Sequence, residues 1–276
     1  MEYDPIKRSL GNVFNKSPFL RKLFYHLLDL LLLRCWHVHK ELKAWRSRLG
    51  VFGSGLGVGE LTILDAGSGF GQYSYWMTNN FPKAKILAVD IKDEQVADCN
   101  NFFQLVGKVN VKFEIADLTK FVQENKYDLA LSVDVMEHIL EDVLVFKNIL
   151  ASLKQGGMLL ISTPSDQGGS DVHEGQEGSF IGEHVRDGYN IKEIEDKLRL
   201  AGFSKIEPRY SYGSPGKISW RLSMKYPMQI LNTSKIFFIF IPFYYLITYP
   251  FAFILNYLDT HSTHKTGTGL IVKAWK

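Results

Sequence analysis

The sequence contains little cysteine, because only Cys35 and Cys99 occur among its 276 residues. Two cysteines so far apart predict neither a disulfide framework nor a thiolate metal site, and they favour a reducing compartment. The net charge is only +3, so the chain lacks the basic excess typical of nucleic-acid binding, and we expect no nucleic-acid partner. The first residues carry two acids before the first base and no compact apolar run, so we expect no signal peptide.

The charges that are present are distributed unevenly along the chain. Residues 1–50 hold ten Lys/Arg against four Asp/Glu, a net charge of +6, which leaves −3 for the other residues. Such a basic segment is either a solvated helix or a segment that meets an anionic surface. The chain has no internal repeat, and its length and 46% hydrophobic content fit one large domain with additions.

Composition divides the chain into four parts. The first is basic and apolar, the second alternates β-rich with helical patterns, the third is strongly apolar and aromatic, and the fourth is a short β-rich run. We predict an amphipathic helical region at 1–58, an α/β core at 59–212, an apolar helical insertion at 213–265 and the final strand of the core at 266–276.

The second part indicates the fold class. Runs rich in Val, Ile and Leu predict strands at 61–65, 84–90, 109–116, 127–133, 158–163, 203–212 and 269–275. Helical patterns lie between them, near 71–80, 93–105, 138–153 and 190–200. Apolar strands that alternate with helices predict a doubly wound α/β sheet covered on both faces.

The first two strands are followed by residues suited to nucleotide binding. Asp65 ends the first strand, and the next turn carries three alternating glycines, Gly67, Gly69 and Gly71. Glycine lets the turn bend sharply and a ligand approach closely, while the following helix presents unpaired N–H groups. Asp90 ends the second strand, where a carboxylate can accept hydrogen bonds from both ribose hydroxyls. Asp117 follows the third strand, where we expect its carboxylate to accept a hydrogen bond from an adenine amino group.

Together these residues resemble the class I S-adenosylmethionine-dependent methyltransferases of the small-molecule branch. Five motifs occur in the family's order, at 65–71, 89–90, 115–117, 127–138 and 156–163. The resemblance implies S-adenosylmethionine as cofactor and a Rossmann-like seven-stranded sheet whose last strand is antiparallel. It implies a cofactor site made of Asp65, Gly67, Gly69, Gly71, Tyr73, Asp90, Ile91, Asp117, Leu118 and Val133.

A dinucleotide-binding dehydrogenase is the main alternative, because a strand, a glycine turn and a later acid also serve NAD. Its fingerprint requires glycine or alanine three residues after Gly69, where this chain has Gln72. The earlier glycine-rich stretch at 53–59 precedes a strand and not a helix, so we interpret it as a linker. These residues also have alternative roles without a cofactor: Asp65 or Asp117 would cap a helix, and Asp90 would lie in a surface turn.

The resemblance implies an in-line displacement at the sulfonium methyl, to which the protein contributes alignment, water exclusion and, where needed, a base. The candidate bases are Glu137, His138, His173 and His184. We favour His184, because it lies in the 182–189 stretch at the carboxyl end of a strand. Arg186 and Tyr189 of that stretch would order the loop, and the glycine-rich 165–171 segment would form a lid.

Residues 236–258 contain no charged side chain, a length sufficient to cross a bilayer. A single crossing would place the final strand on the opposite side of the membrane from the sheet that it should join. In addition, Pro242 and Pro250 should break the run into shorter helices. We therefore predict a lid over an apolar acceptor, or a re-entrant or interfacial hairpin.

Apolar residues also recur at helical spacing near the N-terminus, at Leu20, Leu23, Phe24, Leu27, Leu28 and Leu31. We expect Arg21, Lys22, His26 and Asp29 to face elsewhere. Such a basic amphipathic helix packs on its own protein or lies on an anionic membrane. The remaining histidines of interest lack acidic or thiolate partners at ligand spacing, so we predict no metal at His37, His39, His261 and His264.

These observations predict a methyltransferase that transfers a methyl group from S-adenosylmethionine to O, C or N of a hydrophobic small molecule or lipid-like acceptor. We expect a cytoplasmic protein in peripheral contact with the membrane. One alternative is a protein or peptide methyltransferase with an open cleft. Another is a non-catalytic membrane-associated scaffold with the same fold. The sequence leaves the acceptor and the oligomeric state open.

Overall fold

The computed structural model describes residues 17–52, 61–168 and 185–276. Two of the predicted catalytic candidates, His173 and His184, lie outside the described residues. So do residues 169–171 of the predicted 165–171 lid and the whole 53–59 linker.

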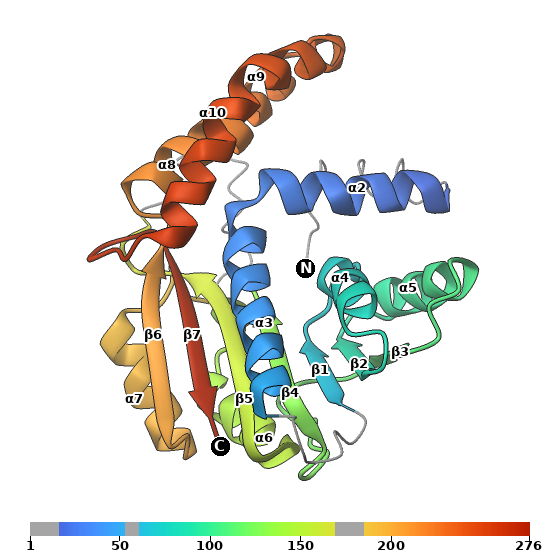
Figure 1. Cartoon of the computed structure of the whole chain (residues 1–276), viewed down its shortest axis with the longest axis vertical. Coiled ribbons are helices and arrows are strands. Elements are labelled where there is room, and N and C mark those ends of the chain that lie inside the picture. Colours follow the sequence, from blue (N-terminus) through green and yellow to red (C-terminus); the bar gives the residue numbers. More distant parts are fainter. Residues whose placement is uncertain (1–16, 53–60, 169–184) are drawn as a thin grey trace.

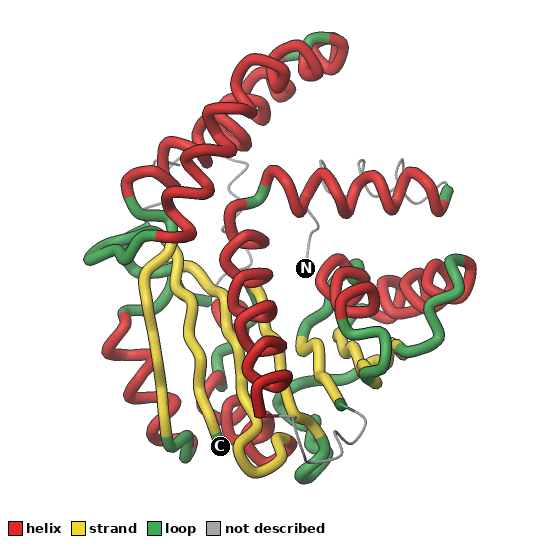
Figure 2. The backbone as a smooth tube through the Cα atoms, in the orientation of Figure 1, coloured by secondary structure: helices red, strands yellow, loops and turns green. Residues whose placement is uncertain are grey.

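A seven-stranded sheet forms the centre of the protein (Figures 1 and 2). Its strands are β1 Thr62–Ala66, β2 Lys85–Asp90, β3 Val111–Ile115, β4 Tyr127–Val133, β5 Leu153–Pro164, β6 Lys205–Ser211 and β7 Gly269–Trp275. Their order across the sheet is β3-β2-β1-β4-β5-β7-β6. Strands β1 to β5 pair in parallel, whereas β7 runs antiparallel between β5 and β6. This confirms the predicted fold class, including the antiparallel last strand.

Helices cover both faces of the sheet, because side chains of each strand alternate between two apolar clusters. In β1, Ile63 packs with residues of α3 (Leu33–Phe52) and α4 (Gln72–Asn80). The next residue, Leu64, packs with residues of the opposite layer, which consists of α6 (Asp142–Ser152) and α7 (Ile191–Ala201). A third cluster joins α5 (Asp93–Leu105) to β2 and β3.

The helix predicted near 138–153 is shorter than expected. A 3₁₀ turn, η1 (Met136–His138), comes first, and α6 begins only at Asp142. Arg186 explains the interruption, because its Nη2 donates to the carbonyl oxygens of Ile139, at 2.9 Å, and Leu140, at 3.3 Å. These carbonyls therefore accept hydrogen bonds from a side chain. This contact is consistent with the loop-ordering role predicted for Arg186.

The N-terminal helix α2 (Pro18–Leu31) packs in a different orientation from the one we expected (Figure 1). Its fully buried residues are Arg21 and Tyr25, whereas Leu23 is exposed. The prediction that Arg21 faces away from the packed side of the helix was wrong. The reason lies in tertiary contacts: the buried Arg21 guanidinium donates to Asp98 and to the Phe70 carbonyl on other elements, and these bonds offset the removal of its charge from water.

The apolar insertion folds into a helical arm that extends beyond the sheet (Figure 1). Its ascending side consists of α8 (Ser214–Trp220), a π-helical turn η2 (Arg221–Lys225) and α9 (Tyr226–Thr233). A 3₁₀ turn, η3 (Lys235–Ile239), leads to the descending helix α10 (Ile241–His261). Pro242 lies in the first turn of α10, but Pro250 lies inside it.

The prediction that Pro250 ends a helix was therefore wrong. A proline removes one backbone hydrogen bond from a helix, and packing against α8 compensates. The Ser219 hydroxyl of α8 lies 3.2 Å from the carbonyl oxygen of Ala252 and 2.6 Å from Asn256 Oδ1. Both acceptors follow Pro250 in α10, so the helix is held in register beyond the proline.

Asp259 attaches the base of the arm to the core. Its buried carboxylate accepts hydrogen bonds from His37 Nε2 at 2.8 Å, and from the backbone N–H groups of Tyr212 at 3.1 Å and Gly216 at 3.0 Å. Burial lowers the pKa of His37. Because Arg209 donates to the Nδ1 of this ring, at 3.1 Å, His37 is the neutral tautomer that carries its proton on Nε2.

Candidate cofactor site

The glycine turn connects β1 to α4 at the carboxyl edge of the sheet. The chain order reverses at this point, because β2 lies on one side of β1 and β4 on the other. In open α/β sheets this switch point is where ligands bind. Gly67 has a φ of +82°, and a Cβ at this position would overlap the side chain of Val135, which follows β4. The turn is therefore packed tightly on one side.

Gly69 is open where Gly67 is crowded. It also has a positive φ, +52°, but no other atom of the described residues lies within 4 Å of the position that a Cβ would occupy. Ser68 lies beside it, and its hydroxyl is buried without a partner among the described residues. Open space over a glycine, next to an unsatisfied buried hydroxyl, fits a ligand that approaches the backbone closely.

Asp90 faces this open glycine from the end of β2. Its Oδ2 accepts a hydrogen bond from the Gly69 N–H at 2.8 Å, and its Oδ1 accepts one from the Lys92 N–H at 3.0 Å. These contacts fix the carboxylate at the rim of the glycine turn. Each oxygen keeps a second lone pair, so the carboxylate can still accept hydrogen bonds from two ligand hydroxyls.

Asp65 lies beneath the turn and does not cap α4. The N-cap of α4 is Gly71, and no side chain caps it. Asp65 is buried and accepts a hydrogen bond from the Ser74 hydroxyl at 2.6 Å. Burial, with a smaller contribution from the negative charge of Asp90, raises the pKa of Asp65 to about 7. Asp65 therefore holds the turn against α4.

The other predicted cofactor residues differ in their exposure. Ile91 is exposed beside Asp90, and Val133 is partly buried at the end of β4. Leu118 packs in the cluster beneath α6, and the Tyr73 hydroxyl lies 3.4 Å from the Cys35 sulfur under α3. Tyr73 and Leu118 therefore pack in the protein around the glycine turn.

Asp117 follows β3 and forms a local turn. Its Oδ1 accepts hydrogen bonds from the backbone N–H of Thr119 at 2.9 Å and from the Thr119 hydroxyl at 2.7 Å. These hydrogen bonds lower the pKa of Asp117, so the group is a carboxylate at neutral pH. No helix begins here, and the alternative role of Asp117 as a helix cap is excluded.

An ion pair that the sequence did not indicate borders the site. Asp134 follows β4 and pairs with Arg34 of α3. Its φ is +51°, a left-handed conformation that only a few non-glycine residues adopt. The backbone N–H of Arg34 donates a hydrogen bond to the Tyr212 hydroxyl at 3.0 Å. A charged residue directly after a buried strand could have drawn attention to Asp134, but no local pattern indicates Arg34.

Glu137 and His138 lie close in sequence but have different surroundings. Glu137 is 1% exposed and accepts a hydrogen bond from the Thr163 hydroxyl at 3.0 Å. Burial, and secondarily the charge of Asp134, raises the pKa of Glu137 to about 8. At neutral pH this group is therefore mainly a protonated carboxylic acid and a poor base. His138 is exposed.

The geometry can be compared with known proteins. A family model described as "Methyltransferase domain" matches residues 58–203. The chain belongs to this family. Its membership confirms the family predicted from the sequence and, for the matched residues, a methyltransferase domain of the S-adenosylmethionine-dependent class.

This chain aligns with only part of the length of each curated relative. Phosphoethanolamine N-methyltransferase 1 of Triticum aestivum is 29% identical over 146 residues, which are 52% of this chain and 28% of the relative. Malonyl-acyl-carrier protein O-methyltransferase 2 of Ilyobacter polytropus is 31% identical over 101 residues, 37% of this chain and 38% of the relative.

A solved structure shows the same fold. Phosphoethanolamine N-methyltransferase 2 of Haemonchus contortus, in complex with S-adenosyl-L-methionine, aligns with a TM-score of 0.54 at 19% identity. The alignment covers 84% of this chain and 52% of that one. At this identity the likeness concerns the fold alone.

Proposed function

We propose that this chain transfers the methyl group of S-adenosylmethionine to a hydrophobic or lipid-like small molecule. The observation that carries the cofactor assignment is the pairing of Gly69 with Asp90 at the switch point of the sheet. It combines a backbone open to close approach with a fixed carboxylate that has free lone pairs.

Different residues of the site would bind different parts of the cofactor. Asp90 would accept hydrogen bonds from the ribose hydroxyls, and Ile91 would cover the adenine ring beside it. Asp117 would accept a hydrogen bond from the adenine amino group. The turn from Gly67 to Gly71 would surround the methionine part. The Ser68 hydroxyl, which has no partner among the described residues, would be a further hydrogen-bonding group. When bound, S-adenosylmethionine supplies an already activated methyl group.

The chain's own contribution would then be alignment and exclusion of water. Glu137, as a buried acid with a raised pKa, would donate a hydrogen bond at neutral pH, and it would act as a base only near pH 8 and above. His184 remains our candidate for a base where the acceptor is a hydroxyl or a carbon acid.

The acceptor class is supported by the position of the arm. The apolar arm begins at Ser214, immediately beyond the carboxyl-edge end of β6 and beside the return to β7. In this fold acceptors approach the carboxyl edge of the sheet. The two relatives reported above are named for different acceptors, phosphoethanolamine and a malonyl group on a carrier protein, so those names leave the acceptor atom open.

Calorimetric titration with S-adenosylmethionine, S-adenosylhomocysteine and NAD tests the cofactor. We expect saturable binding of both adenosyl ligands and none of NAD. Asp90→Ala should weaken S-adenosylmethionine binding about tenfold or more, because a hydrogen bond to a charged group contributes ~1.5–3 kcal/mol. Asp93→Ala, at the exposed start of α5, is the matched control. Equal affinity of the two variants would remove the ribose assignment.

A second assay tests the acceptor class. Transfer of labelled methyl from S-adenosylmethionine would be measured with organic-phase and aqueous metabolite fractions as separate acceptor pools. We expect label in the organic-soluble product. Label only in aqueous products, or in protein, would contradict the hydrophobic acceptor.

A further inference from the structure

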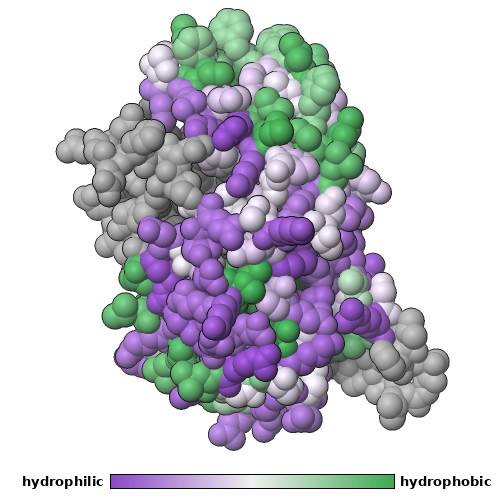
Figure 3. All heavy atoms as spheres, turned by 90° about the vertical axis from the view of Figure 1, so that its left-hand side faces the viewer, coloured by the Kyte–Doolittle hydropathy of each residue, from purple (hydrophilic) through white to green (hydrophobic). Residues whose placement is uncertain are grey.

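The arm exposes an unusually apolar surface. Among the described residues, α10 is the one helix that is long and apolar enough to cross a membrane by length and composition. Many of its large side chains face outward: Leu246 is 75% exposed, Ile247 68% and Phe243 65%. Figure 3 shows apolar residues gathered at the arm, whereas the body below is mainly hydrophilic. Soluble monomers rarely expose such a patch without a binding role.

The charges on the arm have one sign. From Gly213 to Leu258 the sequence contains four Lys/Arg and no Asp/Glu. Three of the cations recur every four residues on the ascending side, at Lys217, Arg221 and Lys225. This spacing places them near one face of the helix. The surface is therefore complementary to an apolar phase with an anionic border.

The arm also satisfies backbone groups internally at its π-helical turn. A π turn displaces the regular hydrogen bonds of an α-helix and leaves carbonyl groups in need of donors. Two tyrosines of α10 supply them: the Tyr244 hydroxyl donates to the Leu222 carbonyl and the Tyr245 hydroxyl to the Ser223 carbonyl, each at 2.7 Å. Such internal satisfaction is what a low-dielectric environment demands.

The exposed face of α2 is a second apolar surface. Phe19 is 73% exposed and Leu23 41%. Each lies two residues, or ~200° around the helix, before a buried residue, Arg21 and Tyr25 respectively. They consequently point away from the protein body. Figure 1 shows α2 at the end of the molecule from which the arm projects, and the opposite face of α2 is held against α5 and the glycine turn through Arg21.

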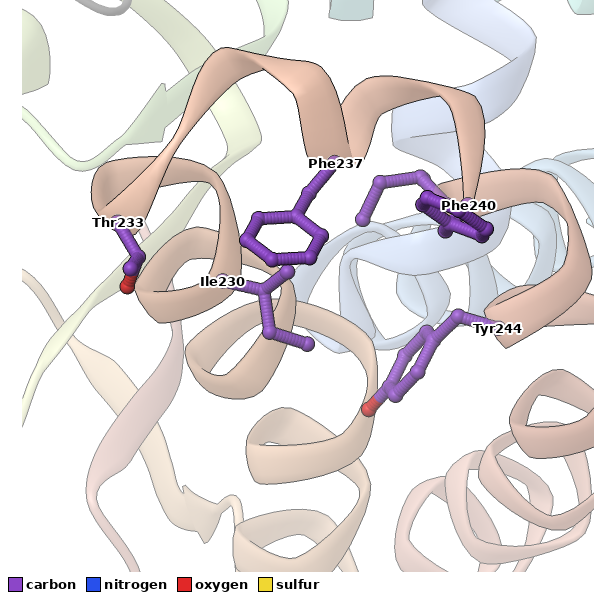
Figure 4. Close-up of a pocket in the computed structure, with 6 residues that line it drawn as sticks. Ile230, Thr233, Phe237, Phe240 and Tyr244 are labelled. Carbon is purple, nitrogen blue, oxygen red and sulfur yellow. The ribbon is translucent and has the colours of Figure 1, made fainter.

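The end of the arm contains an apolar hollow of about 480 Å³. It is lined by Ile230, Thr233, Phe237, Phe240, Ile241 and Tyr244. Figure 4 shows Ile230, Phe237 and Tyr244, which come from α9, η3 and α10, around this space. The volume is in the range of small-ligand sites, and the lining suits a hydrocarbon chain.

We propose that the arm and the outward face of α2 dock on an anionic lipid bilayer, with one lipid acyl chain in the hollow at the end of the arm. Lys217 and Arg221 would lie at the phosphate level, and the exposed apolar side chains of α10 would enter the acyl boundary. The arm would lie along the interface, as interfacial helices do with their apolar face buried ~5–10 Å, and would not cross the bilayer. Lys235, the fourth cation, follows Thr233 near the end of the arm, and this orientation keeps it out of the acyl core.

Flotation of the full-length chain with lipid vesicles tests the docking. The protein should float with vesicles of phosphatidylcholine and phosphatidylglycerol, and far less with phosphatidylcholine alone. Leu246→Asp combined with Phe243→Asp should reduce binding about tenfold or more, because each side chain would lose its transfer into lipid. Leu200→Asp is the matched control, since Leu200 is 69% exposed on α7. No flotation of the intact chain would overturn the proposal.

Charge reversal tests the anionic border. Lys217→Glu and Arg221→Glu should each weaken binding to the anionic vesicles by about fivefold or more, and added salt should have a similar effect. Binding that depends on neither salt nor these residues would contradict the charge argument. Light scattering without lipid tests whether a second copy of the chain binds the arm instead. A dimer that Leu246→Asp converts to a monomer would identify the arm as an interface between copies and would contradict the lipid proposal.

The hollow has its own test. Ile230→Trp should fill it and weaken vesicle binding, whereas Ile218→Trp adds the same ring to the ascending side at an exposed position outside the hollow. A tryptophan ordinarily favours the membrane interface, so weaker binding of only the first variant is a specific result. Equal binding would remove the acyl-chain assignment. Titration with S-adenosylmethionine keeps this test separate from the proposed function, because these variants should retain wild-type cofactor affinity.

Discussion

Arg21 donates a hydrogen bond from Nη2 to the carbonyl oxygen of Phe70, 3.0 Å away, and thereby joins α2 to the glycine turn. The same guanidinium donates from Nη1 to Asp98 of α5 at 2.5 Å and lies over the ring of Phe102, 4.5 Å from its centre. The Tyr25 hydroxyl also donates to the Phe70 carbonyl. The helix that carries an exposed apolar face is thus attached directly to the loop that would hold the cofactor.

Replacement of Arg21 should therefore affect both stability and cofactor binding. Arg21→Ala should lower the free energy of unfolding by about 3 kcal/mol, because the buried Tyr25 hydroxyl, Asp98 and the Phe70 carbonyl would lose a charged donor. It should also weaken S-adenosylmethionine binding, since the Phe70 end of the turn would be held by Tyr25 alone. Urea unfolding and calorimetry measure the two effects. Arg46→Ala, which removes a single exposed hydrogen bond to Asn80, should change neither.

Two glycines of the turn should respond differently to alanine. The Cβ of Gly69→Ala would meet no atom of the described residues within 4 Å, so its cost should be the left-handed backbone alone, ~1–2 kcal/mol of stability. Gly71→Ala, with a φ of +80°, would add a Cβ 3.0 Å from Phe103 and 3.1 Å from Phe113, and should destabilise the protein more.

Cofactor affinity, in contrast to stability, should depend strongly on Gly69. Gly69→Ala should remain folded by circular dichroism yet bind S-adenosylmethionine at least about tenfold more weakly, because its Cβ would occupy the open space over the turn. If the folded Gly69→Ala protein bound the cofactor normally, the ligand would have to lie elsewhere.

The pH dependence of stability should reveal the buried carboxyl group of Glu137. Its pKa is raised to about 8 in the folded protein, against ~4.3 in an unfolded chain. Between these values the folded state holds a proton that the unfolded state releases, so the free energy of unfolding falls as pH rises from about 5 to about 8. Asp65, with a pKa of about 7, acts in the same direction.

Glu137→Gln should flatten this dependence. The variant should gain stability relative to the wild type at pH 8 and differ little at pH 5, as measured by urea unfolding without cofactor. Glu141→Gln, at an exposed position, provides the control. An unchanged pH profile for Glu137→Gln would mean that the carboxyl group is ionised in the folded state.

Asp259 should be essential for attachment of the arm. Asp259→Ala would leave the N–H groups of Tyr212 and Gly216 and the ring of His37 without their acceptor, at a cost of about 3 kcal/mol or more. We expect faster proteolysis within the arm and a lower unfolding midpoint, while Asp196→Ala on the exposed face of α7 behaves as wild type. An arm that resists protease in Asp259→Ala would disprove the anchor.

Much of the fold could be predicted because local patterns agreed with the tertiary structure. The apolar runs at 127–133 and 269–275 became β4 and β7, and the helix expected at 93–105 is α5. The candidate site was found for the same reason: Asp65, Gly69 and Asp90 each end or follow a buried strand, and parallel strands bring their carboxyl ends to one edge. Nothing local could place Arg34 against Asp134, since 100 residues separate them.

By itself the sequence determined the alternation of strands and helices, the glycine turn and its two acids, and the apolar, acid-free arm, because each depends on neighbouring residues. Only the tertiary structure decided which face of α2 is buried and whether α10 continues through Pro250. Those outcomes depend on partners from distant segments, Asp98 and Phe70 for Arg21 and Ser219 for the turn after Pro250. Where such partners are present, they offset the free-energy cost of burying a charged side chain or of placing a proline inside a helix. The tertiary contacts then override the preference of the local sequence.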